Sequence, residues 1–144
     1  MKVYQILRAK SVAKVTTVMP GSSVADAARL LAERRFGAVV VSDDGERALG
    51  ILSERDIVRD LGRRGAECLA DRVEELMTRN IITCAPEDDA QEVLELMTNG
   101  RFRHMPVIRD GRMIGIILIG DVVAARISEL KMERDALEGM IAGN

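Results

Sequence analysis

Apolar residues recur in two stretches of the chain at the spacing of a helix with one buried face. Their positions are Val24, Ala27, Ala28 and Leu31 in the first stretch and Ala90, Val93, Leu94 and Met97 in the second. An i, i+3, i+4, i+7 spacing places the apolar side chains of each stretch on one side of a helix. Ser22 and Ser23 precede the first stretch, and Asp88 and Asp89 precede the second. These residue types favour helix N-caps, so each pair is expected to supply one.

Continuous apolar runs follow both predicted helices, Ala38–Val41 after the first and Met105–Ile108 after the second. Such runs are typical of strands that are covered on both faces. An Asp-Gly pair follows each run, at residues 44–45 and 110–111. The pair predicts a two-residue hairpin turn in each half of the chain.

The other expected elements follow the same order in both halves. They are Val15–Val18, Ala48–Leu52 and a helix from near Ser53 in the first half, and Ile81–Cys84, Met113–Leu118 and a helix from near Ile119 in the second. The first run of each set is β-prone, and the second is the hairpin partner strand. Each half is therefore predicted to be β-α-β-β-α, and the fold class to be α/β (α+β).

The two halves also match residue by residue. Residues 20–36 align with residues 86–102 without gaps, and both segments run from a Pro to a Phe. Farther along, Gly50 aligns with Gly115 and Asp56 with Asp121, after the loss of one residue in the turn. Self-similarity on this scale indicates an internal duplication.

The duplication predicts how the chain is organised. We expect a first repeat with an N-terminal helix in 1–61, a linker with short helical turns in 62–80, a second repeat in 81–126 and a C-terminal helix in 127–144. A repeat of about 60 residues buries too little surface to be stable alone. The two repeats are therefore expected to pack sheet to sheet with pseudo-twofold symmetry, leaving a ligand cleft on each side of the pseudo-axis.

Composition excludes several classes of partner. Aromatic residues make up 2% of the 144 residues and the net charge is −2, so neither base-stacking platforms nor a basic field for nucleic acid is expected. No run approaches the roughly 20 apolar residues that cross a bilayer, so no membrane association is expected. One His and two Cys do not supply the usual zinc spacing, and no metal is expected. A cytoplasmic location with reduced thiols is the default expectation.

Catalytic motifs are absent from the sequence as well. It contains no Gly-x-Ser-x-Gly, no P-loop and no Gly-x-Gly-x-x-Gly pattern. An enzyme would have to rely on carboxylates such as Asp56 and Asp121. In the expected packing these two residues belong to separate clefts, so we expect no catalytic residues and no enzymatic activity.

Two motifs resemble those of a known family. The segment 50–56, Gly-Ile-Leu-Ser-Glu-Arg-Asp, resembles the closing motif of a cystathionine-β-synthase (CBS) domain. Residues 103–107, Arg-His-Met-Pro-Val, are similar to the polar or basic residues that lead into Leu-Pro-Val in the same family. Two such domains in tandem form a Bateman module, so the resemblance implies a stand-alone CBS pair.

The resemblance implies a ligand and roles for particular residues. CBS pairs hold AMP, ADP, ATP, NAD(H) or S-adenosylmethionine between the repeats. By this resemblance Asp56 and Asp121 would take the ribose hydroxyls, while Ser53, Arg103 and His104 would meet phosphate. The chemistry is reasonable, because a carboxylate accepts two hydroxyl hydrogen bonds and a helix N-terminus attracts anions.

Adenine is expected beside the backbone before and within the first strand of each repeat. The residues concerned are Val15, Thr16, Ile81 and Ile82. The two sites should differ, because Gly37 occupies in the first repeat the position of Arg103 in the second. Leu118 likewise occupies in the second repeat the position of Ser53 in the first. The second site is therefore expected to lack one polar contact.

Structural interpretations of the same residues remain open. Ser53 followed by Asp56 is also a plain capping box, and Arg103 and His104 are also ordinary residues at the start of a strand. The favoured hypothesis is a regulatory module that senses energy or redox state and signals to an unidentified regulated protein by conformational or oligomeric change. A homodimer through helical faces is expected. The alternative is a structural dimerisation or interaction module with degenerate ligand sites.

Overall fold

The computed structural model describes residues 1–10 and 15–143, which form two compact units. Unit 1 consists of residues 1–10, 83–107 and 115–143, and unit 2 of residues 15–82 and 108–114. Each unit has its own cluster of buried apolar side chains. The chain passes between the units more than once, so each unit combines segments that are distant in sequence.

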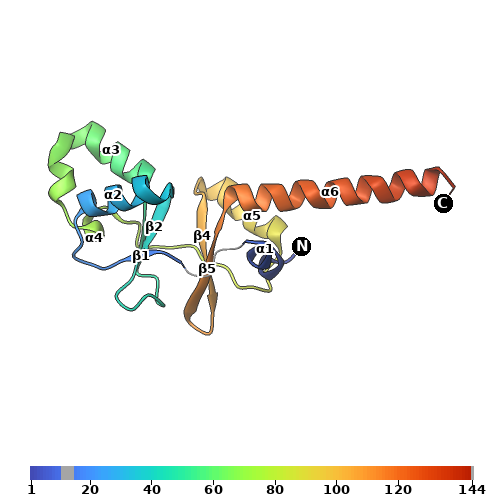
Figure 1. Ribbon diagram of the computed structural model, residues 1–144, viewed down its shortest axis with the longest axis horizontal. Helices are drawn as coiled ribbons and strands as arrows, with labels where there is room; N and C mark the ends of the chain where they lie inside the picture. The colour runs from blue at the N-terminus through green and yellow to red at the C-terminus, as the bar shows by residue number, and fades with distance from the viewer. Residues whose placement is uncertain (11–14, 144) are drawn as a thin grey trace. The chain divides into compact units, whose positions relative to one another are not determined.

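Unit 2 contains a three-stranded sheet and the helices that pack with it (Figure 1). Its elements are β1 (Thr17–Val18), α2 (Val24–Arg34), β2 (Ala38–Val41), β3 (Gly50–Ser53), α3 (Glu54–Arg64), the 3₁₀ helix η1 (Gly65–Ala70) and α4 (Val73–Leu76). The strand order is β1-β2-β3, with β1 parallel and β3 antiparallel to β2. All four residues of β2 are buried, which confirms the predicted covered strand.

The core of unit 2 lies between the sheet and its helices. Its buried members are Val24, Ala27, Leu31, Val39, Val41, Leu52, Ile57 and Val73. Three of these come from α2 at the helical spacing seen in the sequence.

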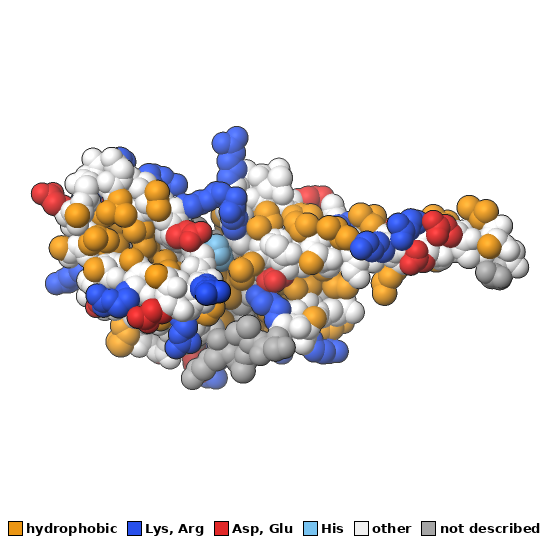
Figure 2. Space-filling model, turned by 45° about the horizontal axis from the view of Figure 1, so that its top comes forward, with side chains coloured by type: hydrophobic (Ala, Val, Ile, Leu, Met, Phe, Trp, Pro, Cys, Tyr) orange, Lys and Arg blue, Asp and Glu red, His pale blue; other side chains and the backbone are white. Residues whose placement is uncertain are grey.

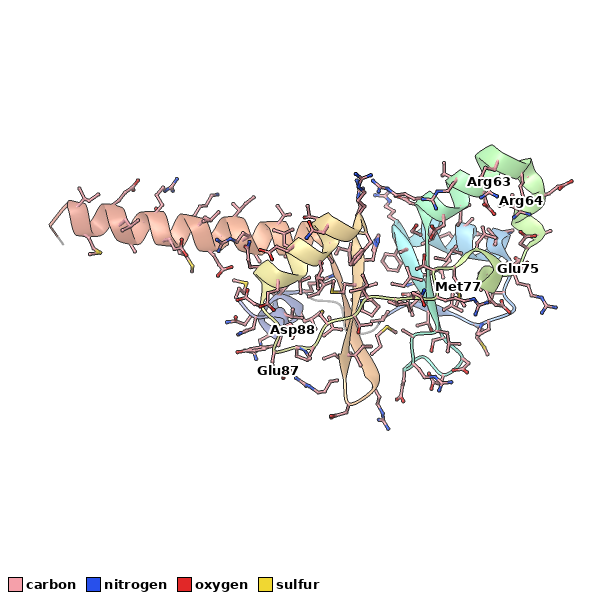
Figure 3. All side chains as sticks on the ribbon, turned by 180° about the vertical axis from the view of Figure 1, so that it is seen from behind. Arg63, Arg64, Glu75, Met77, Glu87 and Asp88 are labelled. Carbon is pink, nitrogen blue, oxygen red and sulfur yellow. The ribbon has the colours of Figure 1, made fainter. Side chains whose placement is uncertain are left out.

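At the end of α3, Arg64 forms ion pairs with Asp60 and Asp71 and so connects α3 to the turn before α4 (Figure 3).

Unit 1 is built around two long helices and most of a hairpin. Its elements are α1 (Val3–Ala9), α5 (Ala90–Gly100), β4 (His104–Arg109), β5 (Arg112–Leu118) and α6 (Ile119–Ile141). The hairpin tip, residues 108–114, packs in unit 2. α6 packs against α5 and α1 near its start and then continues past them (Figure 1). Leu137, Met140 and Ile141 near its end are exposed.

Side chains from all three segments of unit 1 contribute to its core. Its buried members are Val3, Ile6, Cys84, Ala90, Val93, Met97, Met105, Val107, Ile117 and Val122. The strand expected at Ile81–Cys84 is reduced to one parallel bridge between Cys84 and Val107. This bridge corresponds to the pairing of β1 with β2 in the other repeat.

The duplication extends to the ends of the helices. α2 and α5 each contain 11 residues and begin at the N-caps Ser23 and Asp89. Each ends at a left-handed residue with φ 56°, Arg35 in one and Arg101 in the other. In both cases the amide of the following Phe returns to a carbonyl of the last turn, which is a common helix ending. The repeated sequence therefore encodes the same local structure twice.

The segments that precede the repeats exchange places. The amide of Val73 in α4 donates to the Ser22 carbonyl at 2.8 Å, beside α2 of the first repeat. The amide of Val3 in α1 donates to the Asp88 carbonyl at 3.0 Å, beside α5 of the second repeat (Figure 3). The helix that starts the chain thus completes the second repeat, and the segment between the repeats completes the first.

Both predicted hairpins are present, but the predicted two-residue turn is confirmed in the second repeat and wrong in the first. Asp110 and Gly111 have φ of 52° and 77° and form the two-residue turn between β4 and β5. In the first repeat a longer loop joins β2 to β3. There Asp44 Oδ1 accepts the amides of Glu46 and Arg47, both at 2.8 Å. These bonds hold the wider loop and lower the pKa of Asp44, the bond from Arg47 contributing most.

Candidate functional site

Asp56 lies at the start of α3 and is held by the helix cap. Its Oδ2 accepts both the amide and the hydroxyl of Ser53, each at 2.9 Å. The amide of Asp56 in turn donates to Ser53 Oγ at 3.2 Å. The capping box is therefore present. The Asp56 side chain is 17% exposed, and its Oδ1 lies 3.5 Å from the exposed guanidinium of Arg59.

Other predicted residues gather at the same end of unit 2. The amide of Glu54 donates to the Gly37 carbonyl at 2.9 Å, which places Gly37 at the start of α3. Thr17 of the parallel strand β1 pairs with Val40, so Val15 and Thr16 lie level with the beginning of β2. Both are half-buried. Ser53, Asp56, Gly37, Val15 and Thr16 thus belong to one region.

Ile81 and Ile82 follow α4 in unit 2 without regular secondary structure. Ile81 is half-buried, and 43% of Ile82 is exposed. Three residues earlier, Thr78 exchanges two backbone hydrogen bonds with Ile51 of β3. These two isoleucines are therefore carried by the segment that completes the first repeat.

Asp121 holds the corresponding position in unit 1, at the start of α6. Its Oδ2 accepts the Leu118 amide at 3.0 Å, as Asp56 accepts the amide of Ser53. The second donor to this oxygen is the ammonium group of Lys10, at 2.7 Å. Lys10 Nζ also donates to the Ile116 carbonyl at 3.1 Å. The side chains of Lys10 and Asp121 are 21% and 27% exposed.

Lys10 is a site residue that the sequence analysis missed. Leu118 supplies no hydroxyl at the helix start, but the expected loss of one polar contact is wrong, because Lys10 gives Asp121 a second donor. The replacement donor comes from the end of α1, 111 residues away along the chain. Nothing in the spacing of either repeat points to this residue, because α1 precedes the first repeat in sequence and packs with the second.

Arg103 and His104 lie at the same end of unit 1 as Asp121. The amide of Ile119 donates to the Arg103 carbonyl at 2.9 Å, the counterpart of the bond between Glu54 and Gly37. Arg103 is exposed, and His104, half-buried, begins β4. The structure therefore brings Arg103, His104 and the ion pair of Lys10 with Asp121 to the start of α6.

A groove lies between α2 and α3 of unit 2 and adjoins the candidate site, because Gly37 and Glu54 are among the residues that line it. It has a volume of about 480 Å³, and its lining includes Leu31, Phe36, Ile57 and Val58. Phe36 is 38% exposed and Val58 65%. Figure 2 shows hydrophobic side chains gathered on the face of unit 2 that carries these helices. Such a surface favours contact with apolar groups.

The described residues, 1–10 and 15–143, also bear on metal and membrane sites. In this part of the chain no group of three or more His, Cys, Asp or Glu side chains is placed to hold a metal ion. None of the described helices has the length and apolar character needed to cross a membrane. Cys68 and Cys84 are free thiols, and both are buried.

Comparison with known proteins identifies the repeats. The family model of the CBS domain matches residues 7–63 and 73–128. The mitochondrial CBS domain-containing protein CBSX3 of Arabidopsis thaliana is 38% identical over 125 residues, which cover 84% of this chain and 61% of that protein. The CBS-domain protein ATU1752 of Agrobacterium tumefaciens is 42% identical with a TM-score of 0.82, and the match covers 88% of this chain and 99% of that one.

A third comparison concerns the fold. The CBS domain pair of protein MJ0100, solved in complex with 5′-methylthioadenosine and S-adenosyl-L-methionine, has a TM-score of 0.76 at 24% identity. The match covers 90% of this chain and 98% of that one. Two family matches, two equivalent helix starts and the relatives above lead to one conclusion. The chain belongs to the CBS-domain family and carries two CBS domains in tandem.

Proposed function

We propose that this chain is a regulatory module that binds adenine nucleotides through Asp56 and Asp121. The observation that carries the proposal is the equivalence of the two carboxylates. Each stands at the third position of a helix, and the helix start occupies its Oδ2. Oδ1 lies on the other side of each carboxylate and is the atom proposed to accept a ribose hydroxyl.

Phosphate recognition is proposed at the same helix starts. Backbone N–H groups of the first turn of a helix attract anions. In the second repeat the exposed Arg103 adds a cation beside this turn, whereas the first repeat has Gly37 there. Arg103 and His104 are therefore proposed to contact phosphate, and the two sites to differ in their affinity for it.

The adenine base is proposed to lie against aliphatic side chains and backbone. Val15 and Thr16 would receive it in one site, and Ile81 and Ile82 in the other. The fold itself is compatible with adenosine compounds, because the CBS pair of MJ0100 was solved with two of them. At 24% identity that likeness concerns the fold, so the choice among AMP, ADP, ATP and NAD(H) is left to experiment.

The proposed output is a change of conformation or of oligomeric state that a regulated protein senses. A ligand can cause such a change only if it binds one arrangement more tightly than another. The proposed assembly is a homodimer through helical faces.

A second candidate is a structural dimerisation module, which the exposed Phe36 and Val58 in the groove between α2 and α3 favour. The same observation is compatible with both candidates, because a nucleotide sensor also needs a surface that transmits its state. Ligand binding separates them.

The test is a thermal-unfolding series with AMP, ADP, ATP, NAD(H), S-adenosylmethionine and, as a control, GMP. At 100 times its dissociation constant a ligand should raise the free energy of unfolding by about 2.7 kcal/mol. Asp56→Asn and Asp121→Asn should each remove part of the response, and the double variant should remove all of it. If no adenine compound raises the unfolding temperature and none copurifies, the regulatory proposal is wrong and the structural candidate stands.

A further inference from the structure

The two proposed ribose carboxylates differ in the second donor to Oδ2. In the first repeat this donor is the neutral hydroxyl of Ser53, at 2.9 Å. In the second it is the ammonium of Lys10, at 2.7 Å. The oxygen, its amide partner and its place in the helix are otherwise the same. Both carboxylates have a cation nearby, but the two cations are placed differently. Asp56 Oδ1 lies 3.5 Å from the exposed guanidinium of Arg59, whereas Asp121 Oδ2 is bound directly by a half-buried ammonium.

The exchange of α1 and α4 explains why a cation binds Oδ2 in the second repeat, whereas a hydroxyl binds it in the first. Leu7 of α1 packs on Gly115, as Met77 after α4 packs on Gly50. Val3 and Val73 also make equivalent backbone bonds, so position 10 corresponds to position 80. Position 80 is an Asn. The segment that completes the first repeat thus ends in an uncharged amide, and the one that completes the second ends in Lys10.

Lys10 is held firmly enough to act as a fixed charge. It follows α1, whose Val3 and Ile6 lie in the core of unit 1. Its ammonium has two partners, Asp121 and the Ile116 carbonyl, and its side chain is 21% exposed. Partial burial weakens the screening of a charge by solvent and salt.

We propose that Lys10 determines the charge specificity of the Asp121 site, so that this site prefers a phosphorylated adenylate to the neutral nucleoside. This inference rests on the proposed nucleotide-binding function. A ribose held by Asp121 would bring a 5′-phosphate within about 10 Å of the ammonium of Lys10, the distance over which charges interact at 0.1 M salt. Because Lys10 cancels the charge of Asp121, the phosphate meets no net repulsion from the pair. The Asp56 site discriminates less between the two ligands, because Ser53 is neutral and solvent screens the exposed charge of Arg59 more than that of Lys10.

The experiment compares AMP with adenosine by isothermal titration calorimetry. The parent protein carries Asp56→Asn, so that the second site is the one observed. In this background Lys10→Gln keeps a hydrogen-bond donor and removes the charge, and Lys10→Arg keeps the charge. Far-UV circular dichroism and unfolding temperatures check that the variants are folded.

Lys10→Gln should weaken AMP binding about fivefold or more and change adenosine binding less than about twofold. Lys10→Arg should restore most of the preference for AMP. Raising the salt concentration should weaken AMP binding to the parent more than to Lys10→Gln.

The possible outcomes distinguish a failure of the Lys10 proposal from a failure of the proposed nucleotide binding. Equal losses for AMP and adenosine, or an unchanged ratio, would show that Lys10 is structural and would overturn the inference while leaving nucleotide binding intact. A ratio lowered as much by Lys10→Arg as by Lys10→Gln would overturn it too. If neither the parent nor the wild-type protein binds AMP or adenosine, the proposed function fails and the inference fails with it.

Discussion

Ser53 combines a structural role with a proposed binding role, and these can be measured separately. Its hydroxyl accepts the Asp56 amide at the start of α3 and donates to the Asp56 carboxylate. Both bonds belong to the helix cap and need no ligand. A serine followed three residues later by an acid therefore predicts a stable helix start before it predicts a nucleotide site.

Ser53→Ala should lower the free energy of unfolding by about 1 kcal/mol, because it removes the N-cap acceptor of α3. Urea denaturation without ligand measures this loss. Ser128→Ala, at an exposed position within α6, is the matched control and should cause no loss. Equal stability of Ser53→Ala and the wild type would contradict the capping role.

Cys84 provides a second test at the scale of one residue. Burial, followed by the nearby charge of Asp88, raises the pKa of its thiol to about 12. The unfolded thiol has a pKa of about 8.5, so the unfolded state releases its proton first as the pH rises. The stability of the fold that depends on Cys84 is therefore complete below about pH 8.5 and is lost between there and about pH 12.

Cys84→Ala should show a smaller loss of stability than the wild type over this alkaline range. Urea unfolding of both proteins at a series of pH values isolates the effect, because the other titrating groups are common to both. Parallel pH profiles would mean that the thiol is not protected by burial.

At the scale of elements, the paired glycines allow a chain segment to approach a strand closely. A Cβ on Gly50 would lie 3.0 Å from the Thr78 carbonyl oxygen and would also clash with Met77. A Cβ on Gly115 would lie 2.8 Å from Leu7 Cδ2, which is the end of a flexible side chain. A backbone atom moves aside less readily than the end of a flexible side chain. The same substitution at the two glycines should therefore lower the stability of the protein by different amounts.

Gly50→Ala should destabilise the protein more than Gly115→Ala, and adding Leu7→Ala to Gly115→Ala should relieve the clash. Thermal unfolding provides the comparison. Gly62→Ala is the control: it lies within α3 with open space around it, so it should gain up to about 1 kcal/mol of helix stability. If Gly50→Ala proved no more harmful than Gly115→Ala, the fixed backbone contact at Thr78 would be in doubt.

The local sequence pattern was sufficient to predict most helices and strands. It failed where a side chain formed hydrogen bonds with the backbone in place of a regular turn. The spacing of apolar residues located α2 and α5, and the continuous run at residues 38–41 located β2. The Asp-Gly pair at 44–45 had the same appearance as that at 110–111. In the first repeat, however, the Asp44 carboxylate accepts two backbone amides of its own loop. The identity of the Asp-Gly pair alone does not predict these hydrogen bonds.

At the scale of the whole molecule, the groove between α2 and α3 of unit 2 provides a test of the expected homodimer. Val58 is 65% exposed at this groove, so a change there should leave the core intact. Val58→Asp should shift the protein from dimer to monomer in sedimentation velocity, because a charge cannot be buried without a partner.

Met19→Asp is the matched control for that experiment. Met19 is 60% exposed in the same unit and is outside the lining of the groove. It should keep the wild-type sedimentation coefficient. If Val58→Asp and the wild type sediment alike, this groove is not the dimer interface.

The sequence by itself determined the duplication, the main helices and strands, the family and the equivalence of Asp56 with Asp121. These features depend on hydrophobic periodicity and on short motifs. Both are local properties of the sequence and can be recognised without knowledge of the tertiary contacts. The exchange of α1 and α4, the fit of Leu7 on Gly115 and the pairing of Lys10 with Asp121 were decided only by the tertiary structure. They bring together residues about fifty to a hundred and ten positions apart. Burial of the apolar face of α1, not local preference, selects the partner of that helix.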